Sequence, residues 1–170
     1  MQRTFAVLSK KIRPTVGSIT RPANTTAYTA GDAVSDATGD AHLTFTNTVQ
    51  MPLSATIDSV VVSSSNAAGT LPDLELYLFR KDITVIADNA AFTVSDAEAL
   101  TCIGVIDLPV ADWKDMAASS VISVNSIGLD FRAGQEGAAN STIYGQLVVR
   151  NAYVPASGEV FNVELVIAQH

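Results

Sequence analysis

Polar and apolar residues alternate along several short stretches of the chain, which is the pattern of a β-strand with one buried face. In residues 43–49, Leu43, Phe45 and Val49 fall on one face and threonines on the other. The same two-residue period recurs in residues 74–79, 127–132 and 161–167. Further strands are predicted over residues 4–8, 12–19, 56–63, 101–107, 120–125 and 143–150. The pattern therefore predicts about ten short strands, separated by turn-rich connections.

Helix signals are confined to two short stretches. Ser95 is an N-cap candidate followed three residues later by Glu98, which predicts a capping box that opens a single helical turn. A second short turn is predicted over residues 111–118. Many alternating strands without crossover helices must pack sheet on sheet, so the expected fold class is all-β. We predict an antiparallel β-sandwich or jelly roll with an extended N-terminal arm.

The length of 170 residues suits one domain. Residues 1–20 have the composition of a basic, β-prone arm, and residues 21–170 are predicted to form a single β-sandwich domain. Within that domain, residues 21–41 are expected to be a long extended loop. Ordered loops of this length are unusual in a compact domain and often functional. We expect this loop to wrap the sandwich or to reach a neighbouring protein.

Charge is sparse and unevenly placed. Charged residues make up 16% of the chain, the net charge is −7, and all seventeen acidic residues follow position 31. The first 31 residues hold five cations and no acid: Arg3, Lys10, Lys11, Arg13 and Arg21. An acidic body repels nucleic acid, so these cations are candidate protein-binding residues for an acidic protein surface. The alternative is an ordinary edge strand whose lysines and arginines discourage aggregation.

Groups suited to catalysis are scarce. His42 and His170 are the only histidines, Cys102 is the only cysteine, and no Gly-x-Ser-x-Gly elbow is present. The chain therefore has too few histidines and cysteines to favour a nucleophilic triad or a zinc site. Cys102 lies in an apolar, strand-like run and is interpreted as a small hydrophobic residue. The single tryptophan, Trp113, and the 6% aromatic content argue against a sugar-stacking cleft. We expect no enzyme activity, no cofactor and no metal.

Three aspartates of the long loop, Asp32, Asp36 and Asp40, recur at four-residue spacing. Oxygen ligands at such intervals could hold a calcium ion, but EF-hand loops place their ligands at alternate positions and end in a glutamate. Solvated turn aspartates are the favoured interpretation, and a cation site stays open as the alternative.

Membrane and secretion signals are weak in this sequence. The longest apolar runs fall far short of the ~20 residues that cross a bilayer. Residues 1–8 contain no apolar segment of signal-peptide length. We therefore expect no membrane partner, and synthesis in the cytoplasm of the producing cell.

Several segments carry a family resemblance. They are residues 19–34 (ITRPANTTAYTAGDAV), 76–79 (LYLF), 88–92 (DNAAF), 95–96 (SD), 103–106 (IGVI), 144–147 (YGQL) and 152–157 (AYVPAS). From about residue 19 to residue 167, the chain resembles a family of small structural proteins of tailed bacteriophages. The resemblance implies a virion component on the head surface, and it carries over no catalytic residue. It does not extend to residues 1–18, whose role rests on charge alone.

Three functions follow as hypotheses. The first is a capsid decoration or cement protein that binds the lattice of major capsid proteins on the virion surface and stabilises the head, acting as a homotrimer or dimer. The second is another virion part, a head-fibre or tail structural component. The third is a β-sandwich module that binds a small molecule or glycan, which would need an aromatic-lined pocket.

Overall fold

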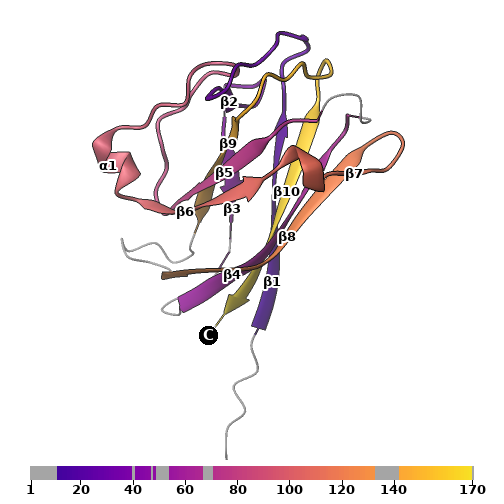
Figure 1. Ribbon diagram of the computed structural model, residues 1–170. Helices are drawn as coiled ribbons and strands as arrows, with labels where there is room; N and C mark the ends of the chain where they lie inside the picture. Colours follow the sequence, from indigo (N-terminus) through magenta and orange to yellow (C-terminus); the bar gives the residue numbers. More distant parts are fainter. Residues whose placement is uncertain are drawn as a thin grey trace, which may run out of the picture.

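The computed structural model describes residues 11–39, 41–46, 48, 54–66, 71–132 and 142–169. These residues build two antiparallel sheets packed face to face (Figure 1), so the predicted all-β sandwich is confirmed. The strands are Lys11–Thr20 (β1), Ala33–Val34 (β2), Leu43–Phe45 (β3), Ser54–Ser64 (β4), Leu74–Phe79 (β5), Cys102–Leu108 (β6), Lys114–Asp115 (β7), Ser120–Arg132 (β8), Ile143–Val149 (β9) and Val160–Gln169 (β10). Helical turns are limited to Asp96–Ala99 (α1) and the 3₁₀ turn Val110–Asp112 (η1) among the described residues.

The order of the strands is that of a jelly roll. One sheet, called the β10 sheet below, has the order β1-β10-β4-β8-β7. The other, called the β9 sheet, has the order β2-β9-β5-β6, with β3 also paired to β9 beside β2. If β2 and β3 are taken as one edge position and the two-residue β7 is left out, eight principal strands remain. Their arrangement is the double Greek key of a jelly roll.

Most strands lie where alternation predicts them. Each predicted strand from residue 12 onward overlaps an observed one, whereas the predicted strand 4–8 lies outside the described residues. The predicted strands 120–125 and 127–132 are a single strand, β8. Positive φ angles at Ser126 (59°) and Gly128 (70°) bend it where its register against β4 shifts. The break in the sequence pattern is therefore a bulge within one strand.

The two predicted helical turns had different outcomes. At α1, the Ser95 side chain accepts a hydrogen bond from the Glu98 N–H, and the Glu98 side chain accepts one from the Ser95 N–H. The predicted capping box is thus confirmed. The predicted turn over 111–118 is only partly right, because η1 covers residues 110–112 and residues 114–115 belong to β7.

Residues 11–20, the second half of the predicted arm, form β1 and pair with β10 along their whole length. Lys11 lies opposite Gln169 at one end of this ladder, and Thr20 lies opposite Val160 at the other. β1 is therefore an edge strand of the sandwich itself. The first half of the predicted arm, residues 1–10, lies outside the described residues.

Glycines allow the two sheets to approach closely along both sides of the core. A Cβ atom on Gly17 of β1 would lie 3.1 Å from a ring carbon of Phe45 on β3. A Cβ atom on Gly104 of β6 would lie 2.8 Å from a methyl carbon of Leu129 on β8. At these positions any side chain would crowd a core residue of the facing sheet. The core is therefore closed off where β1 meets β3 and where β6 meets β8.

Candidate protein interface

The middle of the outer face of the β10 sheet carries small and β-branched side chains and very little charge. Opposed residues of antiparallel strands share a face, so the exposed Val16 identifies its cross-strand neighbours Glu164 and Val61 as outward-facing. We call this surface the bare face. Its central side chains are Ile12, Pro14, Val16, Ser18, Ser59, Val61, Ser63, Val121, Ser123, Asn125, Asn162, Glu164 and Val166, and the charged residues Lys114, Asp130 and Arg132 lie at its margins. None of them is buried, and Ile12 and Val16 are 64% and 57% exposed.

The outer face of the β9 sheet is largely covered by the chain itself, although Val105 and Asp107 on β6 remain exposed. The covering residues, 80–101, connect β5 to β6 and include α1, and they project from the β9 side of the molecule in Figure 1. We call them the cover segment. Its Ile83 and Ile86 are buried, and the Phe92 ring lies 4.7 Å from that of Tyr77. As a result Val148, which faces outward from β9, is 0% exposed.

The edge of β1 is open. The Thr20 N–H donates to Asp36 Oδ2 (2.8 Å), and the Thr20 carbonyl accepts from the Ala37 N–H (2.7 Å). The backbone of Thr20 thus points away from β10. Because backbone groups alternate sides along a strand, the other residues that face this open edge are Ile12, Pro14, Val16 and Ser18. Within the described part of the chain, no backbone group pairs with these four residues on that side.

The basic residues singled out from the sequence are not equivalent. Arg3 and Lys10 lie outside the described residues. Lys11, at the start of β1, is exposed. Arg13 is half-buried on the core-facing side of β1, and its Nε is buried without a hydrogen-bond partner among the described residues. Of the three described cations in the set, only Lys11 is exposed.

Arg21 must be removed from the set of surface cations. Its side chain is buried, and its guanidinium forms an ion pair with Asp88 at 3.0 Å. The Nε donates to the Tyr28 hydroxyl, whose O–H in turn donates to Asp88, and the guanidinium carbon lies 4.6 Å from the centre of the Tyr28 ring. A buried cation needs such partners, so Arg21 binds the cover segment to the sandwich instead of binding another protein.

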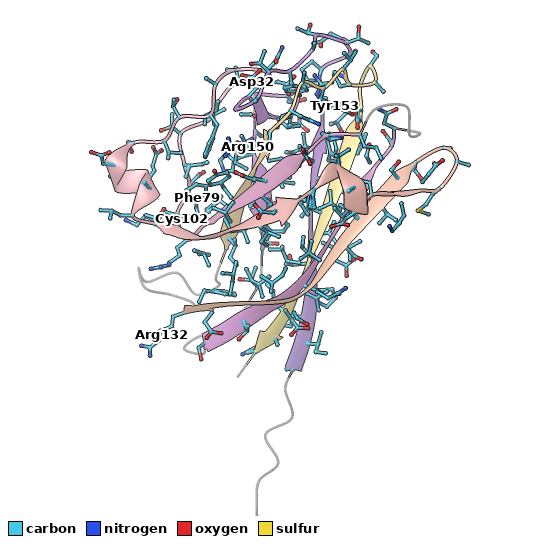
Figure 2. The ribbon with its side chains drawn as sticks, in the orientation of Figure 1. Asp32, Phe79, Cys102, Arg132, Arg150 and Tyr153 are labelled. Atoms are coloured by element: carbon cyan, nitrogen blue, oxygen red, sulfur yellow. The ribbon has the colours of Figure 1, made fainter. Side chains whose placement is uncertain are left out.

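A second buried carboxylate continues this network. Glu159 accepts hydrogen bonds from the hydroxyls of Ser64 and Tyr153, and the Tyr153 ring stacks on Tyr28 with centroids 6.1 Å apart. Burial, together with a hydrogen bond to a carboxylate, raises the pKa of both tyrosines, so each remains a neutral donor. Figure 2 shows Tyr153 at one end of the sandwich, far from Arg132 at the other. The network therefore closes the end of the sandwich opposite to the start of β1.

The loop aspartates serve as turn residues. Asp32 accepts from the N–H and hydroxyl of Thr29, and Asp36 accepts from the N–H groups of Thr20 and Thr38. Asp40 lies outside the described residues. No cluster of three or more potential metal ligands occurs in the described part of the chain. Asp32 and Asp36 are therefore turn residues, as the favoured interpretation expects, but Asp32 is buried and not solvated.

The contacts of Trp113, Cys102 and His42 within the fold are those of structural residues. Trp113 is buried, and its indole N–H donates to the Pro72 carbonyl (3.0 Å). Cys102 is half-buried beside the Gly104 carbonyl, and the His42 Nε2 lies 3.0 Å from Asp82. His170 lies outside the described residues. Among the helices that the structure describes, none has the length and apolar character of a membrane span.

Sequence reasoning missed the bare face. A signal for it was present, because Ile12, Val16 and Val61 occupy the solvent-facing positions of alternating strands where polar residues are expected. The strand assignment alone could not use this signal, since it does not tell which of the two faces of a strand is inward.

Comparisons with known proteins place the chain in no family. No protein family and no curated protein matches the sequence. Among solved structures, the chain is similar to one from the cyanophage Pam1 capsid asymmetric unit, with 14% identity over 99% of this chain and 91% of that one and a TM-score of 0.41. A second similar structure comes from a marine algae virus of the order Picornavirales, with 14% identity over 96% of this chain and 70% of that one and a TM-score of 0.24.

Proposed function

We propose that this chain is a structural protein of a phage virion, a capsid decoration protein that binds the major capsid lattice and stabilises the head. The observation that carries the proposal is the bare face: a sheet surface whose middle holds a single charge, Glu164, with Lys114, Asp130 and Arg132 at its margins. It is left uncovered, while much of the opposite sheet is covered by its own chain. Uncovered apolar surface of this kind is a mark of protein interaction sites. The sequence resemblance to small tailed-phage structural proteins, and the use of jelly rolls in viral capsid domains, add support by analogy.

Charge supplies the orientation of docking. The first 31 residues hold five cations and no acid, whereas the rest of the chain holds five cations and seventeen acids. Lys11 is exposed where β1 begins, next to the bare face, and Arg3 and Lys10 precede it in sequence. An acidic capsid surface would attract this end and repel the body, which steers the bare face toward the lattice.

Stabilisation then follows from mass action. A protein that binds the assembled lattice and not the free capsid subunits shifts the equilibrium toward the intact shell. A copy that bridges two subunits adds an effective-concentration advantage, because release from one subunit leaves it held by the other. This mechanism needs an interface and no catalytic group.

The test uses undecorated shells of the source phage, mixed with the complete protein and followed by co-sedimentation and by the temperature of shell rupture. Saturable binding with a raised rupture temperature is the expected result. The variant Val61→Glu places a charge in the bare face beside Glu164 and should weaken binding by roughly tenfold or more. Leu100→Glu is the matched control, since Leu100 is 83% exposed in the cover segment.

A second pair of variants tests the charge argument. Arg3→Glu/Lys10→Glu should weaken shell binding, and the weakening should depend on salt concentration. Arg80→Glu/Lys81→Glu makes the same change in net charge at exposed positions of the cover segment and should retain binding. Deleting residues 1–18 is a poor test, because it would remove most of β1 from its ladder with β10. Absence of binding to intact shells by the unmodified protein would overturn the proposal in favour of a head-fibre or tail component.

The third hypothesis, a glycan-binding module, receives no support from the aromatic residues of the described chain. Trp113 and Tyr153 are buried, and Tyr77 faces Phe92 under the cover segment. A glycan array with the complete protein distinguishes it: specific binding of a sugar in the absence of shell binding would favour that hypothesis over decoration.

A further inference from the structure

We infer that the open edge of β1 pairs with the same edge of a second copy of this chain, so that two β10 sheets join into one continuous sheet about a twofold axis. The inference concerns the protein by itself and goes beyond capsid binding. It rests on three features of the strand: its backbone pattern, the position of its proline, and the charges at its two ends.

The backbone pattern is self-complementary. Among the described residues, the N–H groups on the open edge that have no backbone partner belong to Ile12, Val16 and Ser18, since Pro14 has no N–H. In an antiparallel pair with Ile12 opposite Ser18 and Pro14 opposite Val16 of the second copy, every one of these N–H groups meets a carbonyl. Pro14 has only to accept a hydrogen bond there.

The proline and the occupied edge at Thr20 together restrict the register of pairing. A proline on an edge strand normally discourages pairing, because it interrupts the row of donors. Moving the register by two residues so that Val16 lies opposite Val16 places Ile12 against Thr20. Both backbone groups of Thr20 are already bonded, to Asp36 and Ala37. The N–H of Ile12 would then have no acceptor in the second copy.

The charges at the two ends of β1 are complementary in the same register. Pairing must stop near Thr20, where residues 36–37 occupy the edge. Lys11 of one copy then arrives beside Asp36 of the other, an opposite charge, and symmetry repeats the contact at the far end. The two Lys11 side chains lie at opposite ends of the paired strands, so the cations do not meet.

The pairing also reduces exposed apolar surface. Ile12 and Val16, the most exposed members of the bare face, project to one side of β1 and would join their counterparts in a stripe across the two copies. A closed twofold pair uses the open edge of each copy completely, so growth ends at two. The open edge of β1 therefore fits the same edge of a second copy better than it fits an unrelated strand, which lacks the matched proline and charges.

The test measures the mass of the complete protein by sedimentation equilibrium from micromolar to hundreds of micromolar concentration. We expect a reversible dimer. Val16→Pro removes an N–H that faces away from β10, so the β1–β10 ladder stays intact. The dimer loses two intermolecular hydrogen bonds, because the twofold axis repeats the contact. This substitution should weaken the dimer by roughly tenfold or more. Val16→Thr, which keeps the N–H and the β-branched shape, is the matched control and should remain dimeric.

Charge variants sharpen the assignment. Asp36→Asn and Lys11→Gln should each weaken the dimer, and the double variant should weaken it by less than the sum of both effects, because the two groups act as a pair. A monomer across the whole concentration range, a trimer, or a dimer unaffected by Val16→Pro in a folded protein would each overturn the inference. Circular dichroism of each variant verifies the fold. Shell binding is not part of this test, so its outcome is separate from that of the proposed function.

Discussion

The outer faces of the two sheets differ most clearly at their central strands. On the β9 sheet, Val148 faces outward and is completely buried beneath the cover segment, which is anchored by the ion pair of Asp88 with Arg21. On the β10 sheet, Val61 also faces outward and is only half-buried, surrounded by serines and by Glu164. The same residue type on the same kind of position thus has two roles. The covered valine contributes to the stability of the fold, and the uncovered valine is available to another protein.

The largest expected effect comes from releasing the cover. Arg21→Met leaves Asp88 as a buried acid without its cation, which should lower the free energy of unfolding by about 3–5 kcal/mol. Arg132→Met, an exposed position on β8, should change it by less than about 0.5 kcal/mol. Denaturant titration measures both, and hydrogen exchange should show faster exchange in the cover segment of Arg21→Met. Equal stabilities of the two variants would show that the buried pair does not hold the cover.

A matched pair of substitutions tests the two faces directly. Val148→Thr buries a hydroxyl that has no arranged acceptor and should cost about 1–3 kcal/mol. Val61→Thr makes the same change on the bare face, where solvent can bond the hydroxyl, and should cost less than about 0.5 kcal/mol. Thermal unfolding monitored by circular dichroism compares them. Equal losses would mean that the isolated protein already covers its bare face, for example by self-association at the concentration used.

The smallest expected effect is the change in stability of the cover segment at low pH. Hydrogen bonds from the side chain and backbone of Ser95, and from Thr84, lower the pKa of Glu98 from 4.5 to about 2. An ionised carboxylate therefore links α1 to the rest of the cover segment. Because the folded pKa lies below the unfolded one, this contribution is fully present above about pH 4.5 and is lost as the pH falls toward 2.

A carboxyl-resolved NMR titration checks this expectation. The Glu98 resonance should have its midpoint near pH 2, and the Glu98→Gln variant should lack this transition. A midpoint near 4.5 would mean that the bonds from Ser95 and Thr84 do not persist in solution.

Local pattern predicted much of the fold. Alternation located the long strands because each has one face in the core, and the spacing of Ser95 and Glu98 located α1 because a capping box involves only neighbouring residues. Arg21 could not be placed in this way. Its acidic neighbour Asp88 is 67 residues away in sequence, and a lone cation before a proline carries no local sign of burial. Its assignment to a surface set came from net charge, which does not distinguish inside from outside.

The bare face illustrates a second limit. Val61 and Val16 were included in predicted strands, yet which sheet remains uncovered depends on the path of residues 80–101. That path is set by contacts such as the hydrogen bond of the Ser35 hydroxyl to the Ile86 carbonyl, between residues 51 positions apart. Neither periodicity nor composition encodes such a contact. The candidate interface therefore emerged only when the two faces could be compared in space.

The antiparallel ladder of β1 and β10 has a mechanical consequence. Lys11 and Gln169 are opposed at one end of that ladder, so the chain enters and leaves these two strands at the same end of the sandwich (Figure 1). A tension that pulls residues 11 and 169 apart would load the hydrogen bonds of the ladder one after another, from Lys11 toward Thr20, so that the two strands separate stepwise. A load spread over the bare face would instead act on all the strands of the β10 sheet at once. Force transmitted through the face should therefore be resisted far better than force transmitted through the ends.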